Sequence, residues 1–90
     1  KLTESKDSNE NNWFVNLPDR IEASVLIVQD FTGIVGCYDG FIYCIHLKSG
    51  EIRWKFKTGE AVKCTAVFSI DGERIFFGSY DHTIYCLSVE

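Results

Sequence analysis

The sequence predicts an all-β chain built from about two copies of one four-stranded antiparallel unit. Three observations predict it: an internal repeat of 41–42 residues, short runs rich in Val, Ile, Phe and Tyr between turn residues, and no helical i, i+3, i+4 apolar spacing. At 90 residues the chain is one small domain at most, or a piece of one. Because it contains no Met, we expect a segment of a longer protein.

The repeat appears when the two halves of the chain are aligned. Residues 13–30 align with 54–71 at an offset of 41, and residues 36–47 align with 78–89 at an offset of 42. One residue is therefore inserted in the second copy. The matched pairs are Trp13 with Trp54, Asp30 with Asp71, and Gly36, Tyr38, Asp39, Ile42, Tyr43 and Cys44 with Gly78, Tyr80, Asp81, Ile84, Tyr85 and Cys86.

The elements follow in order along the chain. Residues 1–12 are polar apart from Leu2 and predict a disordered, solvated tail. An orphan outer strand is expected at 13–17, a complete four-stranded unit over 21–57, and a partial unit over 62–89. Within the two units we expect strands at 21–28, 33–38, 41–47 and 51–57, and at 62–69, 74–80 and 83–89.

Two hairpin turns stand at equivalent places in the repeat. Asp39-Gly40 predicts a two-residue type I′ turn, which needs positive φ at both central residues. Asp81-His82 takes its place in the second copy. Because His tolerates positive φ less well than Gly, we expect the second turn to be looser or differently shaped.

The strand expected at 41–47 indicates how the units pack. It is apolar on both faces apart from His46, whereas a half-exposed antiparallel strand alternates apolar and polar residues. The sheet is therefore expected to lie between two neighbours. Short four-stranded sheets that repeat every ~40–45 residues and stack face to face are typical of β-propeller blades.

The segment 44–59 resembles the tryptophan-docking pattern of PQQ-like (quinoprotein-type) β-propellers. In that pattern Cys44 takes the small position, Ser49 stands for Thr, and Gly50, Trp54 and Gly59 match directly. The resemblance implies that these residues, with Trp13 and Cys86 at repeat-equivalent places, dock one blade on the next. Two departures, His46 for Asp and Pro18 for Gly in the preceding partial copy, are expected to weaken turn contacts without changing the fold.

Two strings, VGCYDGFIYCIHLKSGEIRWKF and FFGSYDHTIYCL, resemble the carboxy-terminal propeller of the β-alanine-activating, acyl-CoA-synthetase-like enzymes. Those proteins carry an adenylation domain, a carrier domain and then a PQQ-like propeller. The resemblance implies a non-catalytic scaffold or interaction module in a larger acyl-activating protein. Two alternatives stay open: a WD-repeat docking platform, and a fragment of a PQQ-dependent dehydrogenase.

Each alternative lacks part of its pattern. Residues 66–72 and 78–84 are similar to the body of a WD repeat, but no Gly-His opens a repeat and no Trp-Asp closes one. A quinoprotein dehydrogenase would need Glu, Asn and Asp metal ligands and a pair of adjacent cysteines, and neither occurs here. We therefore expect no cofactor.

The candidate side chains are better explained by packing than by catalysis. Trp13 and Trp54 occupy equivalent places, as packing positions do, and each indole N–H is expected to bond a carbonyl of the next blade. The four cysteines, at 37, 44, 64 and 86, form no CxxC pair and are expected to be small buried thiols in a reducing compartment, the cytoplasm. Asp39 and Asp81 are expected to cap their turns.

The net charge and the incomplete number of blades limit the kinds of partner that we expect. The net charge of −4 and scattered basic residues argue against nucleic acid and anionic membranes, and no apolar run approaches the length of a membrane-spanning helix. Fewer than two full blades would leave apolar faces open. We therefore expect neighbouring blades, either from the same parent chain or from a head-to-tail homo-oligomer of three or four copies in which 13–17 adds to the edge of 83–89.

Overall fold

The fold is described by a computed structural model that covers residues 4–5 and 12–90. These residues form β-strands and turns with no helix, which confirms the all-β prediction. The strands are β1 (Glu4–Ser5), β2 (Phe14–Val15), β3 (Leu26–Val28), β4 (Thr32–Gly36), β5 (Phe41–His46), β6 (Ile52–Lys57), β7 (Val67–Phe68), β8 (Arg74–Gly78) and β9 (Ile84–Ser88).

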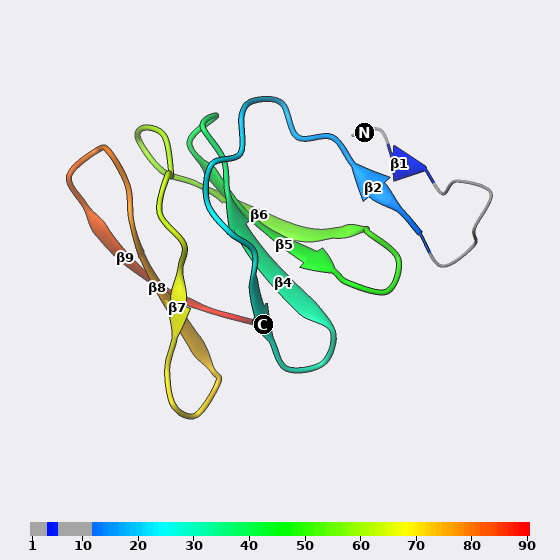
Figure 1. Cartoon of the computed structure of the whole chain (residues 1–90). Helices are drawn as coiled ribbons and strands as arrows, with labels where there is room; N and C mark the ends of the chain where they lie inside the picture. Colours follow the sequence, from blue (N-terminus) through cyan, green and yellow to red (C-terminus); the bar gives the residue numbers. More distant parts are fainter. Residues whose placement is uncertain (1–3, 6–11) are drawn as a thin grey trace.

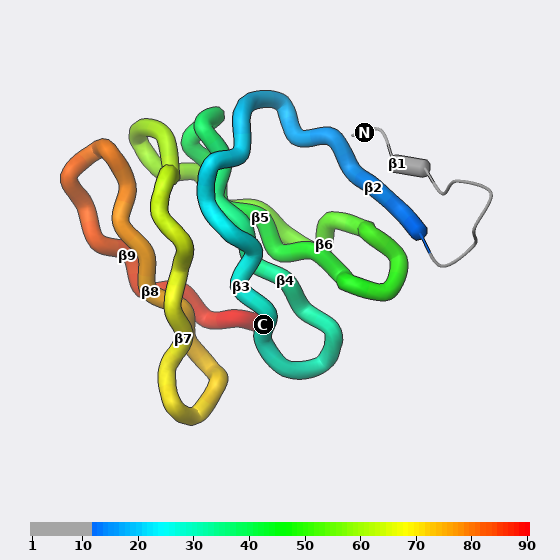
Figure 2. Tube along the Cα trace, viewed as in Figure 1, coloured from blue at the N-terminus to red at the C-terminus, as the bar shows by residue number. Residues whose placement is uncertain are grey.

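The strands form three antiparallel sheets in simple sequence order. The central sheet runs β3-β4-β5-β6, the second sheet runs β7-β8-β9, and β1 pairs with β2. Figures 1 and 2 show the two larger sheets side by side, and Figure 1 shows the β1–β2 pair beyond the central sheet on the side away from β7–β9. The second sheet therefore has one strand fewer than the central sheet, as the partial repeat predicts.

The orphan strand predicted at 13–17 is reduced to Phe14–Val15, and two further predicted strands begin later than expected. Pairing begins only at Leu26 in the first unit and at Val67 in the second, whereas strands from residues 21 and 62 were predicted. The reason is that the preceding residues bond elsewhere: the N–H of Val62 donates to the carbonyl of Cys37 in the central sheet at 3.0 Å. This stretch joins two sheets and does not extend one of them.

The predicted disordered tail lies mostly outside the described residues, because residues 1–3 and 6–11 are not described. Within it, Glu4–Ser5 differs from the prediction and pairs with β2, in the register Glu4 with Val15 and Ser5 with Phe14. The physical reason is that a single strand leaves its backbone groups unpaired, and an adjacent polar segment can satisfy them.

The prediction of a two-residue type I′ turn at Asp39-Gly40 is wrong. The N–H of Gly40 donates to the carbonyl of Cys37, and only Gly40 has positive φ, at 91°. This is a three-residue hairpin loop, 38–40, that ends in a left-handed residue. The second turn was expected to differ, yet His82 adopts φ of 73° and donates to Ser79 in the same way. The two turns are therefore alike, because the flanking strand register demands the same geometry.

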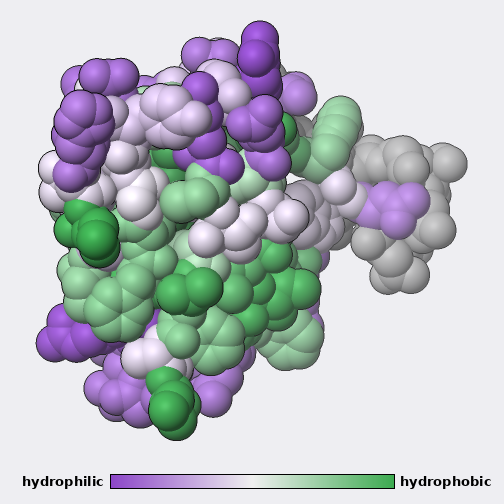
Figure 3. All heavy atoms as spheres, turned by 60° about the vertical axis from the view of Figure 1, so that its left-hand side comes forward, coloured by the Kyte–Doolittle hydropathy of each residue, from purple (hydrophilic) through white to green (hydrophobic). Residues whose placement is uncertain are grey.

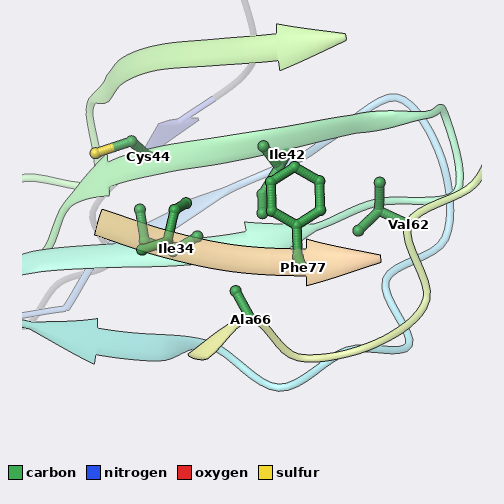
Figure 4. Close-up of a cluster of buried hydrophobic side chains, with 7 residues drawn as sticks. Ile34, Ile42, Cys44, Val62, Ala66 and Phe77 are labelled. Carbon is green, nitrogen blue, oxygen red and sulfur yellow. The ribbon is translucent and has the colours of Figure 1, made fainter. Parts of the chain in front are cut away.

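The main core lies between the two large sheets. Ile34 and Ile42 of the central sheet meet Ile75 and Phe77 of β8, and all four side chains are at most 4% exposed. In Figure 4 the ring of Phe77 lies beside Ile42, with Val62 and Ala66 close by. This cluster is completed by buried and half-buried members: Cys44, Leu26, Trp54, Tyr85, Leu87 and Val89.

A second core covers the opposite face of the central sheet. Its buried members are Val35, Cys37, Tyr43 and Ile45. The residues that pack on them come mainly from the segment of the predicted orphan strand: Trp13, Val15 and Leu17, together with Phe41 and Ile52. The central sheet is thus apolar and covered on both faces, as the sequence of β5 predicts.

Candidate functional site

The candidate site is a pair of junctions between neighbouring repeat units. At each junction, a tryptophan near the end of one unit packs against the unit that follows it in the sequence. The indole Nε1 of Trp54 donates to the carbonyl of Val89 at 3.1 Å, across the gap between the two large sheets. The indole Nε1 of Trp13 donates to the carbonyl of Leu47 at 2.9 Å. Leu47 and Val89 are equivalent in the repeat, so the structure places both indoles in one recurring docking geometry.

Gly50 and Gly59 lie at close approaches in the two junctions. Gly50 has φ of 81°, and a Cβ there would approach the Trp13 ring to 2.5 Å. A Cβ on Gly59 would lie 3.0 Å from the Cβ of Asp81. Both positions therefore bring backbone close to a side chain of the neighbouring unit, which glycine permits.

Asp39 and Asp81 each hold their own hairpin together. Asp39 accepts from the N–H of Phe41 at 2.9 Å and from the hydroxyl of Tyr43. Asp81 accepts from the N–H of Thr83 at 2.9 Å and from the hydroxyl of Tyr85. The recurrence of an Asp four residues before a Tyr was visible in the alignment and could have revealed this pair.

Asp81 has one further partner that Asp39 lacks. The N–H of Gly59, at the end of the preceding unit, donates to Asp81 Oδ2 at 2.8 Å. The hydrogen bond from Tyr85, with help from the Gly59 and Thr83 amides, lowers the pKa of Asp81 to about 2. Pro18 occupies the place of Gly59 in the preceding copy and carries no N–H, so the equivalent bond to Asp39 cannot form.

Other hydrogen bonds repeat at both junctions. The N–H of Tyr38 donates to the carbonyl of Arg20 at 2.9 Å, and that of Tyr80 donates to Ala61 at 3.0 Å. The same pattern links Cys37 Sγ with the carbonyl of Asp19 and Ser79 Oγ with that of Glu60. Sequence reasoning missed these contacts because they use backbone atoms, whose partners depend on chain path.

Thr58 closes the junction between the two large sheets and was also missed. Its buried hydroxyl donates to a carbonyl, that of Gly40 at 2.8 Å or Glu60 at 2.7 Å, and lies 3.0 Å from Ser79 Oγ. The equivalent residue in the preceding copy is Leu17, so no repeated polar residue marked this position.

The four thiols divide into two classes. Cys37 and Cys44 are buried, and burial raises the pKa of both thiols. Cys64 and Cys86 are exposed, which corrects the prediction of four buried thiols. Cys86 is exposed because it lies on the outer face of the second sheet, whereas its equivalent Cys44 is covered by that sheet. All four sulfurs are free.

The outer face of the second sheet repeats the face of the central sheet that forms the main core. We call it the open face. Its apolar side chains are Val67, Phe76, Ile84 and Cys86, and Arg74 lies on the same face, with its guanidinium 3.9 Å from Cys86 Sγ. Val67 pairs with Phe76, and Phe76 pairs with Cys86, so these side chains lie on one side of the sheet. Figure 3 shows hydrophobic side chains gathered on this side of the molecule. The equivalent core residues are Leu26, Ile34, Ile42 and Cys44.

In the part of the chain that the structure describes, Cys44 and His46 do not form a hydrogen-bonded nucleophile–base pair. Cys44 is buried between the sheets, whereas His46 is half-buried and its Nδ1 accepts from the N–H of Lys48 at 3.3 Å. No group of three or more His, Cys, Asp or Glu side chains in residues 4–5 and 12–90 could hold a metal ion. In the same part of the chain, no helix has the length and apolarity needed to cross a membrane.

Comparison with known proteins relates the chain to two larger molecules. No family model matches the sequence. The chain is 38% identical over 78 residues to the beta-alanine-activating enzyme of Drosophila melanogaster, an alignment that covers 84% of this chain and 8% of that enzyme. It also resembles the crystal structure of BamB from Moraxella catarrhalis, with a TM-score of 0.70, 21% identity, and coverage of 82% of this chain and 22% of BamB.

The likeness to BamB concerns the fold. BamB is a β-propeller, and the chain matches about a fifth of it. The central sheet with four strands and the second sheet with three match the predicted complete and partial blades. The chain therefore consists of adjacent antiparallel β-propeller blades and spans less than a tenth of the enzyme to which its sequence is similar.

Proposed function

We propose that the chain is a non-catalytic PQQ-like propeller segment of a larger acyl-activating protein, where it serves as a scaffold and interaction module. The observation that carries the proposal is the repeated docking of Trp13 on Leu47 and of Trp54 on Val89. The tryptophans are the largest side chains of the chain, and both are used to join neighbouring blades.

The similarity to the beta-alanine-activating enzyme supports the acyl-activating parent. The tryptophan spacing of the PQQ-like pattern, with Gly50 and Gly59 at the tight junctions, supports the repeat family. We also propose a cytoplasmic location, which the four thiols without disulfides support because disulfides are rare in a reducing compartment.

The test is β-alanine-dependent exchange of pyrophosphate into ATP, measured on this chain and on the full-length protein that contains it. We expect no exchange from the chain alone. In the full-length protein, Trp54→Ala is expected to change the exchange rate per folded molecule by less than about twofold. Lys55→Ala is the matched control on the same strand, with an exposed side chain.

Exchange activity in the isolated chain would overturn the proposal. So would a loss of exchange with Trp54→Ala while far-ultraviolet circular dichroism and the mass of the full-length protein are unchanged. Either result would mean that these residues take part in the activation step itself.

A further inference from the structure

The chain contains two Asp-Gly pairs, and the structure places them in different surroundings. Asp39-Gly40 lies in the hairpin loop between β4 and β5, and Asp71-Gly72 lies in the loop between β7 and β8. Gly40 is buried, whereas Asp71 and the preceding Ile70 are exposed. Figures 1 and 2 show the loop between β7 and β8 protruding at one end of the second sheet.

An aspartate followed by glycine can rearrange without an enzyme or a cofactor. The backbone nitrogen of the glycine attacks the side-chain carboxyl carbon of the aspartate, and a C–N bond forms. The carboxyl hydroxyl leaves as water together with the amide proton. Water then opens the succinimide ring, and opening at the former backbone carbonyl gives isoaspartate, whose main chain runs through the side-chain carbons. Glycine favours the attack because it has no Cβ to obstruct the approach.

We propose that Asp71 is a modification site, at which the folded protein forms a succinimide with Gly72 and then isoaspartate, while the fold protects Asp39. Ring closure requires that the carboxyl group leaves its hydrogen bonds and that the peptide between the two residues rotates. The two pairs differ in what holds these groups in place.

The Asp39-Gly40 pair is held by residues outside its loop. Both carboxylate oxygens of Asp39 accept hydrogen bonds, one from the N–H of Phe41 at 2.9 Å and one from the hydroxyl of Tyr43, a side chain that is 1% exposed. The carbonyl of Gly40 accepts from the N–H of Thr58 at 2.7 Å and lies 2.8 Å from the hydroxyl of Thr58. Gly40 therefore cannot turn its nitrogen toward the Asp39 carboxyl carbon unless the contact with the following blade link opens.

The hydrogen bonds of the Asp71-Gly72 pair come from within its own loop. Asp71 Oδ1 accepts from the hydroxyl of Ser69 at 2.5 Å and from the N–H of Glu73 at 3.0 Å. The N–H of Gly72 donates to the carbonyl of Ser69 at 2.9 Å. Opening of this exposed loop alone therefore frees the pair, and such loops open at a small cost in free energy.

The same hydrogen bonds give the reaction a pH dependence. The bond from the Ser69 hydroxyl, with help from the Glu73 amide, lowers the pKa of Asp71. The nearby cation is Arg74 of β8, and the charged residues that line the adjoining cavity between the large sheets are Asp30, Arg53, Glu73 and Glu90. Because ring closure expels water from the protonated carboxyl, we expect the reaction at Asp71 to become faster as the pH falls from about 7 to about 5.

The test is peptide mapping of the full-length protein that contains this chain, incubated in its folded state and sampled over days to weeks. Trypsin cleavage after Arg20, Lys48, Lys63 and Arg74 places Asp39 in peptide 21–48 and Asp71 in peptide 64–74. Electron-transfer fragmentation distinguishes isoaspartate from aspartate in each peptide. We expect isoaspartate to accumulate at Asp71 at least about tenfold faster than at Asp39, because the Asp39 loop must first open.

The matched control is the same protein unfolded in guanidinium chloride. There the two Asp-Gly pairs have lost their surroundings and should react within about twofold of each other. Asp71→Glu is a second control, because a glutamate would have to close a larger ring. This variant should abolish the isoaspartate signal in peptide 64–74 and leave the far-ultraviolet circular dichroism of the protein unchanged.

A ratio of the two rates in the folded protein that is no larger than the ratio in the unfolded protein would overturn the proposal. So would isoaspartate at Asp71 that forms in the unfolded protein alone, because the folded loop would then protect Asp71 as well. Neither result would bear on the exchange assay, since the modified loop lies away from the activation step.

Discussion

The N–H of Gly59 donates a 2.8 Å hydrogen bond to Asp81, and so joins the end of one blade to the hairpin turn of the next. The same carboxylate accepts from the hydroxyl of Tyr85 in its own blade. The carboxylate of Asp81 therefore accepts hydrogen bonds both from its own hairpin and from the preceding blade. In the preceding copy Pro18 replaces Gly59, and only the hairpin function is kept.

Titration of Asp81 is predicted to affect stability at low pH. Its folded-state pKa is about 2, below the ~3.9 of an unfolded Asp. A lowered pKa means that its stabilising contribution is present above about pH 4 and is lost as pH falls toward 2. Carboxyl NMR should show Asp81 titrating near 2, and Tyr85→Phe should raise that pKa because it removes the largest cause. Tyr43→Phe is the control, since Tyr43 bonds Asp39, and an equal effect would contradict the assignment.

Adding one methyl group at the junction is predicted to destabilise the chain. Gly36→Ala would drive a Cβ to 2.4 Å from Val62, and overpacking of this kind costs about 1–3 kcal/mol. Gly78→Ala is the matched control because nothing lies within 4 Å of that position. Urea unfolding of both variants measures the difference. Equal free energies of unfolding for the two variants would contradict the prediction, because they would show that the Val62 side chain moves aside without loss of stability.

The backbone of Phe31 is predicted to be strained, so that replacing this residue with glycine increases the stability of the fold. Phe31 has φ of 54° and is 56% exposed, whereas the positive-φ residue in the longer loop of the second copy that lacks a side chain is Gly72, with φ of 74°. Left-handed backbone costs a bulky residue roughly 1–2 kcal/mol. Phe31→Gly is expected to raise the free energy of unfolding by up to ~1 kcal/mol, although it removes the contact of Lys48 with the ring. Gly72→Phe is expected to lower it, and the reverse order in thermal or urea unfolding would contradict the strain.

The cysteines are predicted to react in two phases with a thiol reagent such as Ellman's. Cys64 and Cys86 are exposed and should react quickly, whereas Cys37 and Cys44 are buried with raised pKa and should react only on unfolding. Single Cys→Ser variants assign the phases. Four equal rates in the folded chain would contradict the burial pattern.

The repeat allowed the architecture to be predicted because each blade uses the same residue types at the same places. The apolar pattern on both faces of β5 predicts two covered faces, and the structure has a core on each. The PQQ-like spacing led directly to Trp54 and Gly59. The tryptophan–carbonyl and Asp–Tyr contacts that occur in both copies come from residues that repeat in the sequence, so an alignment of two copies carries packing information.

Other features could not be read from the sequence. The turn at Asp39-Gly40 has the residues of a type I′ turn, but the register of β4 and β5 imposes a three-residue loop. Residues 62–66 look like strand because they are apolar, yet Val62 bonds the neighbouring sheet. Cys86 was expected to be buried like Cys44, and its exposure depends on which blade lies next to it. In each case the deciding partner lies far along the chain or outside it.

The inserted residue of the second copy lies in one loop. Val28 pairs with Thr32 in the first blade, which leaves 29–31 as the loop, while Ser69 bonds Arg74 in the second and leaves 70–73. The strand registers and the tryptophan docking on either side are unchanged by the extra residue. The loop between β7 and β8 therefore tolerates a change of length, and Ile70 at its start is fully exposed. A fluorophore, an affinity tag or a second folded domain could be inserted at this point while the blade surfaces keep their function.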